Sequence, residues 1–136
     1  MTTADSAGTD ATYVQALPSD ATAPGEARRG VAETLARWAL PQYVDGAQLV
    51  ASELVTNAVR HGAPPVTMAL SHTLQTLRLD VGDGSDREPV PGLSEIEPDA
   101  EGGRGMSIVE AVSDDHGVEQ VANDGKRVFA SWRLKD

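Results

Sequence analysis

The segment 45–62 constrains the fold most, because it is the clearest amphipathic helix in the sequence. Asp45 and Gln48 have the three-residue spacing of a capping box, and Gly62 follows the last helical position as a stop signal. The apolar face holds Ala47, Ala51, Leu54, Val55 and Ala58, and the opposite face holds Ser52, Glu53, Thr56, Asn57 and Arg60. A helix patterned in this way needs a second layer of structure to cover its apolar side.

The rest of the chain contains further strand and helix patterns. They predict, in chain order, a strand at 13–17, a helix that begins within 19–24 and ends before Pro41, strands at 66–70 and 76–81, a helix after the glycines of 102–105, and strands at 118–122 and 127–134 joined by an Asn123-Asp124-Gly125 turn. Helices grouped in this way predict an α/β two-layer sandwich, in which the helices cover one face of a mixed sheet.

The length of 136 residues suits a single domain. Residues 1–12 are small and polar, so we expect a disordered tail there and one domain over 13–136. Between Asp83 and Glu101 the regular pattern stops, and seven acidic residues and three prolines accompany a single basic residue. A loop of this length inside a compact domain is usually functional or mobile.

Charge and cysteine content exclude several classes of function. Eleven Lys and Arg against 21 Asp and Glu give a net charge of −10, which argues against nucleic acid as a direct partner. With no cysteine, the chain has no disulfide, thiolate nucleophile or iron–sulfur ligand. No apolar run approaches the roughly 18 residues of a membrane span, and residues 1–12 do not resemble a signal peptide. We therefore expect a cytoplasmic protein that binds small molecules or other proteins.

One pair of polar residues and one further carboxylate are candidates for chemistry. Glu53 and Asn57 lie four residues apart and project from one side of the predicted helix. A carboxylate beside an amide suits a general base and a magnesium ligand, although a solvated helix face has the same pattern. Asp83 ends a predicted strand before Gly84. A carboxylate there can accept a hydrogen bond from an exocyclic amine such as that of adenine, or it can belong to an ordinary turn.

The glycine-rich run 102–105 precedes a predicted helix. Glycines let the backbone approach an anion, and a helix N-terminus offers free N–H donors and a favourable dipole, although many such runs only form turns. In so acidic a chain, a phosphate would need backbone donors, Mg²⁺ and a few bases such as Arg104. His61 lies in the last helical turn, where a histidine suits the helix dipole as well as a ligand role.

Taken in order, these signals resemble the GHKL-type ATPase domain of histidine kinases, Hsp90 and gyrase. The run 53–62 (ELVTNAVRHG) closely resembles the N box of the bacterial anti-sigma factor serine/threonine kinase family, and 103–109 (GRGMSIV) resembles its second glycine box. The resemblance covers about residues 13–134. The family's first box often reads Asp-x-Gly-x-Gly, whereas here Ser85 follows Asp83-Gly84 and the second glycine is missing.

The resemblance implies a Bergerat fold that binds ATP with Mg²⁺. Glu53 would be the general base, Asn57 would coordinate Mg²⁺, and Asp83 would bind the adenine amino group. The segment of about 84–101 would form a lid over the nucleotide. The positions implied to bind the cofactor are Asn57, Arg60, Asp83, Gly84, Gly103, Arg104, Gly105 and Met106.

The same resemblance implies a protein kinase that phosphorylates a STAS-type anti-sigma antagonist and sequesters a sigma factor. Such proteins often dimerise, and Leu49 on the polar side of the helix is the one residue that hints at a homodimer. One alternative is a non-catalytic, nucleotide-gated regulator that presents a surface to a protein partner. A plain α/β interaction domain that binds no nucleotide is the other.

Overall fold

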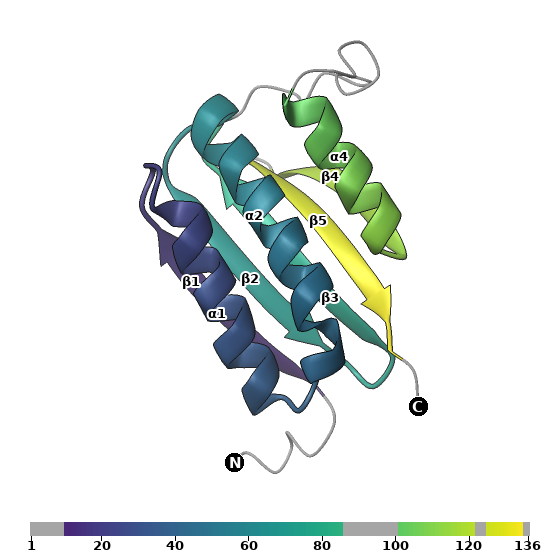
Figure 1. The fold of residues 1–136 in the computed structure, drawn as a ribbon. Coiled ribbons are helices and arrows are strands. Elements are labelled where there is room, and N and C mark those ends of the chain that lie inside the picture. The colour runs from purple at the N-terminus through teal and green to yellow at the C-terminus, as the bar shows by residue number, and fades with distance from the viewer. Residues whose placement is uncertain (1–9, 86–100, 122–124, 135–136) are drawn as a thin grey trace.

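The computed structural model describes residues 10–85, 101–121 and 125–134, and only the backbone of 101–106. Figure 1 shows one sheet with helices packed on one side of it. The elements are β1 (Ala11–Leu17), α1 (Ala23–Arg37), the short 3-10 helix η2 (Pro41–Tyr43), α2 (Val44–His61), β2 (Val66–His72), β3 (Thr76–Asp83), α4 (Glu101–Val112), β4 (Asp115–Val121) and β5 (Gly125–Arg133).

The sheet has five strands in the order β1-β2-β3-β5-β4, and each neighbouring pair is antiparallel. The predicted two-layer α/β sandwich is confirmed, but the prediction of a mixed sheet is wrong. The single helix α4 returns the chain so that β4 runs parallel to β3. However, β5 folds back as the hairpin partner of β4 and occupies the place beside β3. The parallel strands are therefore never neighbours.

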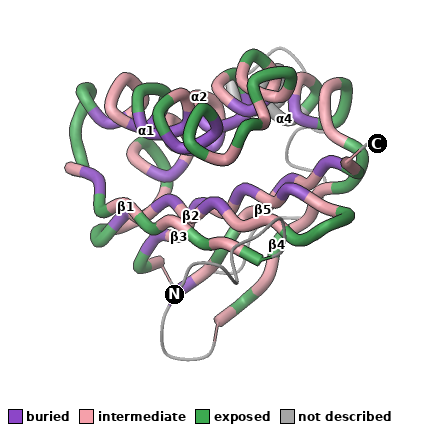
Figure 2. The backbone as a smooth tube through the Cα atoms, turned by 90° about the horizontal axis from the view of Figure 1, so that it is seen from below, coloured by how far each residue is buried: buried purple, intermediate pink, exposed green. Residues whose placement is uncertain are grey.

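The core lies between the helices and the sheet, as Figure 2 shows by the buried positions that face each other across the two layers. Alternate residues of β2 and β3 point toward the helices, as the period of two in a strand requires. The largest fully buried side chains are aliphatic or sulfur-containing, except for Thr34: Leu35, Met68, Leu70, Leu77, Leu79, Val31, Val50, Val55, Val66 and Val109. The opposite face of the sheet carries no helix among the described residues.

Helix α2 begins one residue earlier than predicted, and its capping box does not form. Tyr43 occupies the N-cap position, and no side chain caps the helix there. The Gln48 amide instead donates to the backbone oxygen of Arg28 at 2.9 Å, which links α2 to α1. The predicted stop at Gly62 is confirmed, since Gly62 N donates to the oxygen of Ala58 and ends the helix.

Other boundaries shift because strand pairing extends the elements. β1 begins at Ala11, so residues 11 and 12 pair with β2 and do not belong to a disordered tail. β4 begins at Asp115, three residues before the predicted start, because it pairs with β5 from there. Residues 1–9 of the predicted tail, 86–100 of the predicted lid, residue 122 of the predicted strand 118–122 and residues 123–124 of the predicted turn lie outside the described residues.

Trp132 ties α4 to the sheet. Its indole N–H donates to the backbone oxygen of Val112 at 2.6 Å, at the end of α4, and the residue is 7% exposed. Replacing Trp132 with Phe leaves the partly buried carbonyl of Val112 without this donor, so we expect a loss of about 1–3 kcal/mol in the free energy of unfolding. Urea denaturation would measure it. The control Val14→Ala changes a residue that is 65% exposed and should stay within about 0.5 kcal/mol. Equal stability of the two variants would contradict this role of Trp132.

Candidate functional site

Four chain segments meet at one end of the molecule. Figure 1 places the end of α2, the end of β3, the start of α4 and the start of β5 there. A backbone hydrogen bond from Gly84 N to the oxygen of Ala63 joins the segments that follow α2 and β3. Helix α4 packs against α2. The N box, the first glycine box and the second glycine box therefore lie at the same end of the fold.

Asp83 is the buried charge at this end. Its side chain is 3% exposed and points toward the helix side of the sheet, as do the other buried residues of β3. Its Oδ1 accepts hydrogen bonds from the backbone N–H of Ser85 at 2.8 Å and of Ala63 at 3.4 Å. Removing a charged carboxylate from water costs free energy unless a positive charge and hydrogen-bond donors replace the water. These two N–H donors therefore offset only part of the cost of burying Asp83.

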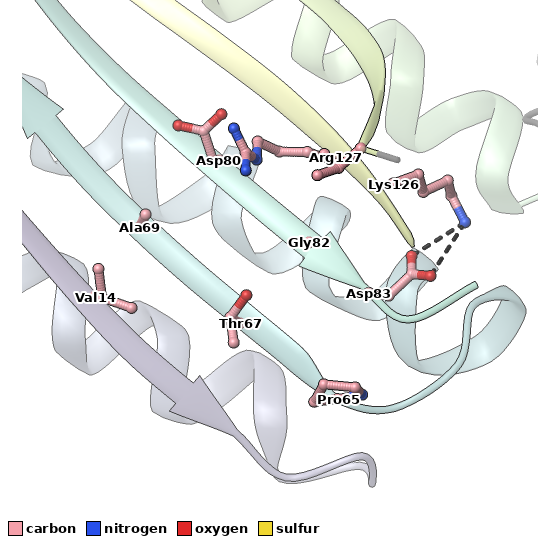
Figure 3. A pocket seen from close by; sticks show the side chains of 10 residues that line it. Val14, Pro65, Thr67, Ala69, Asp80, Gly82, Asp83, Lys126 and Arg127 are labelled. Atoms are coloured by element: carbon pink, nitrogen blue, oxygen red, sulfur yellow. Dashed lines mark hydrogen bonds and ion pairs between the residues drawn. The ribbon is translucent and has the colours of Figure 1, made fainter. Parts of the chain in front are cut away.

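A further partner of Asp83 among the described residues is Lys126, which the sequence did not single out. Its Nζ lies 3.0 Å from Oδ2 and 3.4 Å from Oδ1, and Figure 3 shows both contacts as dashed lines. Asp83 and Lys126 are cross-strand partners in the register of β3 and β5. The only signal in the sequence was rarity, because Lys126 is one of two lysines in the chain. Strand pairing is what places it beside the carboxylate.

Gly62 lets the end of α2 approach this carboxylate. A Cβ at Gly62 would clash with the carboxylate carbon and both carboxylate oxygens of Asp83. The backbone of Gly62 has φ −99°, which any residue can adopt, so the requirement for glycine comes from the close approach alone. The glycine predicted as a helix stop thus also forms one wall around Asp83.

The predicted N-box residues lie on α2. Glu53 and Asn57 are both half-buried, one turn apart, whereas Arg60 and His61 are exposed. With a helical rise of about 1.5 Å per residue, Asn57 lies about 7.5 Å along the helix axis from Gly62. The structure therefore brings Asn57 and Asp83 to the same end of the molecule, with Glu53 one turn further along the helix.

The second glycine box is not a turn before a helix. Gly103, Arg104, Gly105 and Met106 lie within the first two turns of α4, which begins at Glu101. The first four N–H groups of a helix have no partner within it, so the start of α4 supplies backbone donors for an anion. Helical geometry extends further toward the N-terminus than glycine content predicted, because glycine only weakens a helix and does not prevent it.

A hollow of about 420 Å³ lies on the other face of the sheet. Its floor holds Thr67, Ala69, Asp80 and Gly82, which alternate with the buried core residues, and Asp83 and Lys126 line one end of it (Figure 3). Most of the hollow is therefore separated from α2 and α4 by the sheet, and it is not the place where the three boxes meet. Nearby on this face, hydrogen bonds to Asp80 raise the pKa of the Arg78 guanidinium.

The described residues contain no group of three or more His, Asp and Glu side chains that could hold a metal ion. None of the described helices combines the length and the apolar character that a membrane crossing requires.

The comparison with known families agrees with this architecture. A sequence model described as a histidine kinase-like ATPase domain matches residues 17–132, which is most of the chain. The chain therefore belongs to the histidine kinase-like ATPase domain family, and the expected resemblance to a GHKL-type ATP-binding domain is confirmed. No curated protein matches it at a significant level.

The contact between Gly62 and Asp83 generates a prediction. In Gly62→Ala, the added methyl group must displace the Asp83 carboxylate, so we expect a loss of about 1–3 kcal/mol in the free energy of unfolding. We also expect the thermal stabilisation by ATP to be lost. Differential scanning fluorimetry with and without ATP measures both effects.

The matched control is Gly46→Ala in the first turns of the same helix. A Cβ there meets only Trp132 Nε1, at an ordinary 3.8 Å. The greater helix propensity of alanine should make this variant as stable as the wild type or more so. If Gly62→Ala keeps the full response to ATP, the close packing around Asp83 is not needed for binding.

Proposed function

We propose that this protein is an ATP-binding serine/threonine protein kinase of the anti-sigma factor type. The observation that carries the proposal is the placement of Asp83. A buried carboxylate from β3 lies against the end of the helix that carries Glu53 and Asn57. Membership of the histidine kinase-like ATPase family supports nucleotide binding at this end of the fold.

The residues present fit a nucleotide. Asp83 supplies the buried acceptor that would bind the exocyclic amine of adenine, and Gly62 and Gly84 keep the backbone close around it. The start of α4 would bind the phosphates: Gly103 would donate its backbone N–H, and Gly105 and Met106, whose N–H groups lie beyond the free first turn, would lie against the phosphates. In this way a chain with a net charge of −10 can bind a triphosphate without a cluster of basic side chains.

Three further side chains complete the proposed assignment. Asn57 would offer an amide oxygen to Mg²⁺, which takes oxygen ligands and retains several waters, so few protein ligands are required. Arg60 and Arg104 would add positive charge near the phosphates. The metal would supply electrostatic stabilisation of the phosphate oxygens.

Glu53 is proposed as the general base. A serine hydroxyl of the partner attacks the γ-phosphorus, the bond between that phosphorus and the β,γ-bridging oxygen breaks, and ADP leaves. Glu53 takes the proton of the attacking hydroxyl. Positioning and electrostatics contribute most of such a reaction, and a general base contributes typically about 10²- to 10⁴-fold.

The proposed partners are a STAS-type antagonist, which receives the phosphate, and a sigma factor, which is sequestered. The resemblance of 53–62 to the N box of the anti-sigma factor kinases supports this choice. Leu49, which is 41% exposed on α2, supports a homodimer contact on that helix. The proposed location is the cytoplasm, where these partners are found.

Glu53→Ala tests the catalytic assignment. We expect ATP affinity to stay near the wild-type value while the rate of phosphate transfer falls by about 10²- to 10⁴-fold. Transfer from labelled ATP to a STAS-domain protein captured with this chain measures the rate, and calorimetry measures the affinity. The control Glu33→Ala removes an exposed carboxylate of α1 and should leave both quantities unchanged. A normal rate in Glu53→Ala would show that another group takes the proton.

Asn57→Ala tests the magnesium ligand. We expect this variant to lose most of the gain in ATP affinity that Mg²⁺ provides, because an oxygen ligand is missing. The measurement is calorimetric titration with ATP in Mg²⁺ and in EDTA. In EDTA the variant and the wild type should bind alike. An Mg²⁺-dependent gain equal to that of the wild type would exclude Asn57 as a ligand.

The labelled-ATP experiment also separates the kinase from a nucleotide-gated regulator of the same fold. A wild-type protein that binds ATP and its partner, yet transfers no phosphate, would favour the regulator.

A further inference from the structure

Lys126 has no place in the nucleotide-binding scheme described so far, yet its position is tightly determined. Its register partner on β3 is Asp83. Facing residues on adjacent strands have Cβ atoms about 4.5–5.5 Å apart, so the backbone itself holds the two charges together. The side chains are 16% and 3% exposed, which makes this a largely enclosed ion pair.

The start of β5 is also fixed in position. Gly125 has φ +95°, a conformation that favours glycine, and a Cβ there would clash with the backbone oxygen of Asp83. The residue before Lys126 is therefore packed directly against the end of β3. This close approach leaves Lys126 little freedom to move away from the carboxylate through its backbone.

The pair retains capacity for a ligand. Oδ1 of Asp83 accepts from Ser85 N and Ala63 N and lies 3.4 Å from Lys126 Nζ, whereas Oδ2 contacts Nζ at 3.0 Å. A carboxylate oxygen has two acceptor sites, and an ammonium group has three N–H donors. Beside each other, Oδ2 and Nζ thus offer one acceptor and one donor about 3 Å apart.

We propose that Lys126 is a base-recognition residue, whose ammonium donates a hydrogen bond to ring nitrogen N1 of adenine. This inference rests on the proposed function, in which Asp83 accepts from the adjacent exocyclic amine. On that edge of adenine, a donor and an acceptor occupy neighbouring positions. The Asp83–Lys126 pair presents the complementary acceptor and donor, so it would bind the exocyclic amine and N1 of adenine at the same time.

A lysine that only neutralised Asp83 would behave differently. It would raise the affinity equally for every nucleotide whose exocyclic amine binds Asp83, whether or not the base has a nitrogen at position 1. A direct donor distinguishes adenine from 1-deazaadenine, in which a C–H group replaces N1. The ratio of the two affinities therefore reports the hydrogen bond separately from the stability of the ion pair.

The experiment is calorimetric titration of the full chain with ATP and with 1-deaza-ATP. We expect the wild type to bind ATP about tenfold or more tightly than the analogue, as a hydrogen bond to a charged group predicts. Lys126→Met keeps a side chain of similar length without donors, and we expect it to bind the two nucleotides alike. Lys126→Arg restores donors, and we expect the preference for ATP to return.

Arg127→Met is the matched control. It removes one positive charge from the next residue of β5, which is exposed on the outer face and pairs with Glu119. Its preference for ATP over the analogue should equal that of the wild type. Circular dichroism and thermal melts establish which variants fold.

Two results would overturn the proposal. One is equal wild-type affinity for ATP and 1-deaza-ATP, which decides the question even if Lys126→Met does not fold. The other is a Lys126→Met protein that binds both nucleotides more weakly but keeps the wild-type ratio, since that result assigns Lys126 the role of a counter-ion. A wild-type protein that binds no ATP would instead overturn the proposed function itself.

Discussion

The burial of the Asp83 carboxylate is the constraint on which the rest of the site depends. Removing a charged carboxylate from water costs several kcal/mol unless partners replace the lost hydration. Here the partners come from three directions: the ammonium of Lys126 on β5, the N–H of Ala63 beyond α2, and the N–H of Ser85 after β3. One charge thereby holds together three segments that are far apart in the sequence.

Close backbone approach makes this arrangement geometrically feasible. Gly62 and Gly125 each lie where a Cβ would clash with atoms of Asp83, and Gly84 lies equally close to Pro64. Glycine at these positions lets the end of a helix, the end of one strand and the start of another converge. The end of the fold proposed to bind the nucleotide is therefore a junction of chain ends around one carboxylate, while the aliphatic core fills the space between the layers.

Local patterns predicted the elements better than their arrangement. The apolar repeat identified α2, and the alternation of apolar and polar residues identified β3, because both patterns are set by neighbouring residues. The prediction of a mixed sheet was wrong because it required β4 to lie beside β3. Instead β5, the hairpin partner of β4, lies between them, and local sequence patterns do not specify strand order. The capping box did not form because α2 begins before Asp45, and the Gln48 amide donates to Arg28 of the neighbouring helix. The glycine run joined α4 because local glycine content does not by itself end a helix.

The sequence by itself determined the family, the layered α/β architecture and the residues proposed for catalysis and phosphate binding, since motif residues keep their order and spacing along the chain. Only the tertiary structure revealed Lys126, because 43 positions separate it from Asp83 and the register of β3 and β5 brings them together. It also showed that Gly62 packs on a carboxylate. Contacts of this kind depend on strand pairing and on how helices lie over the sheet, and no local pattern encodes either.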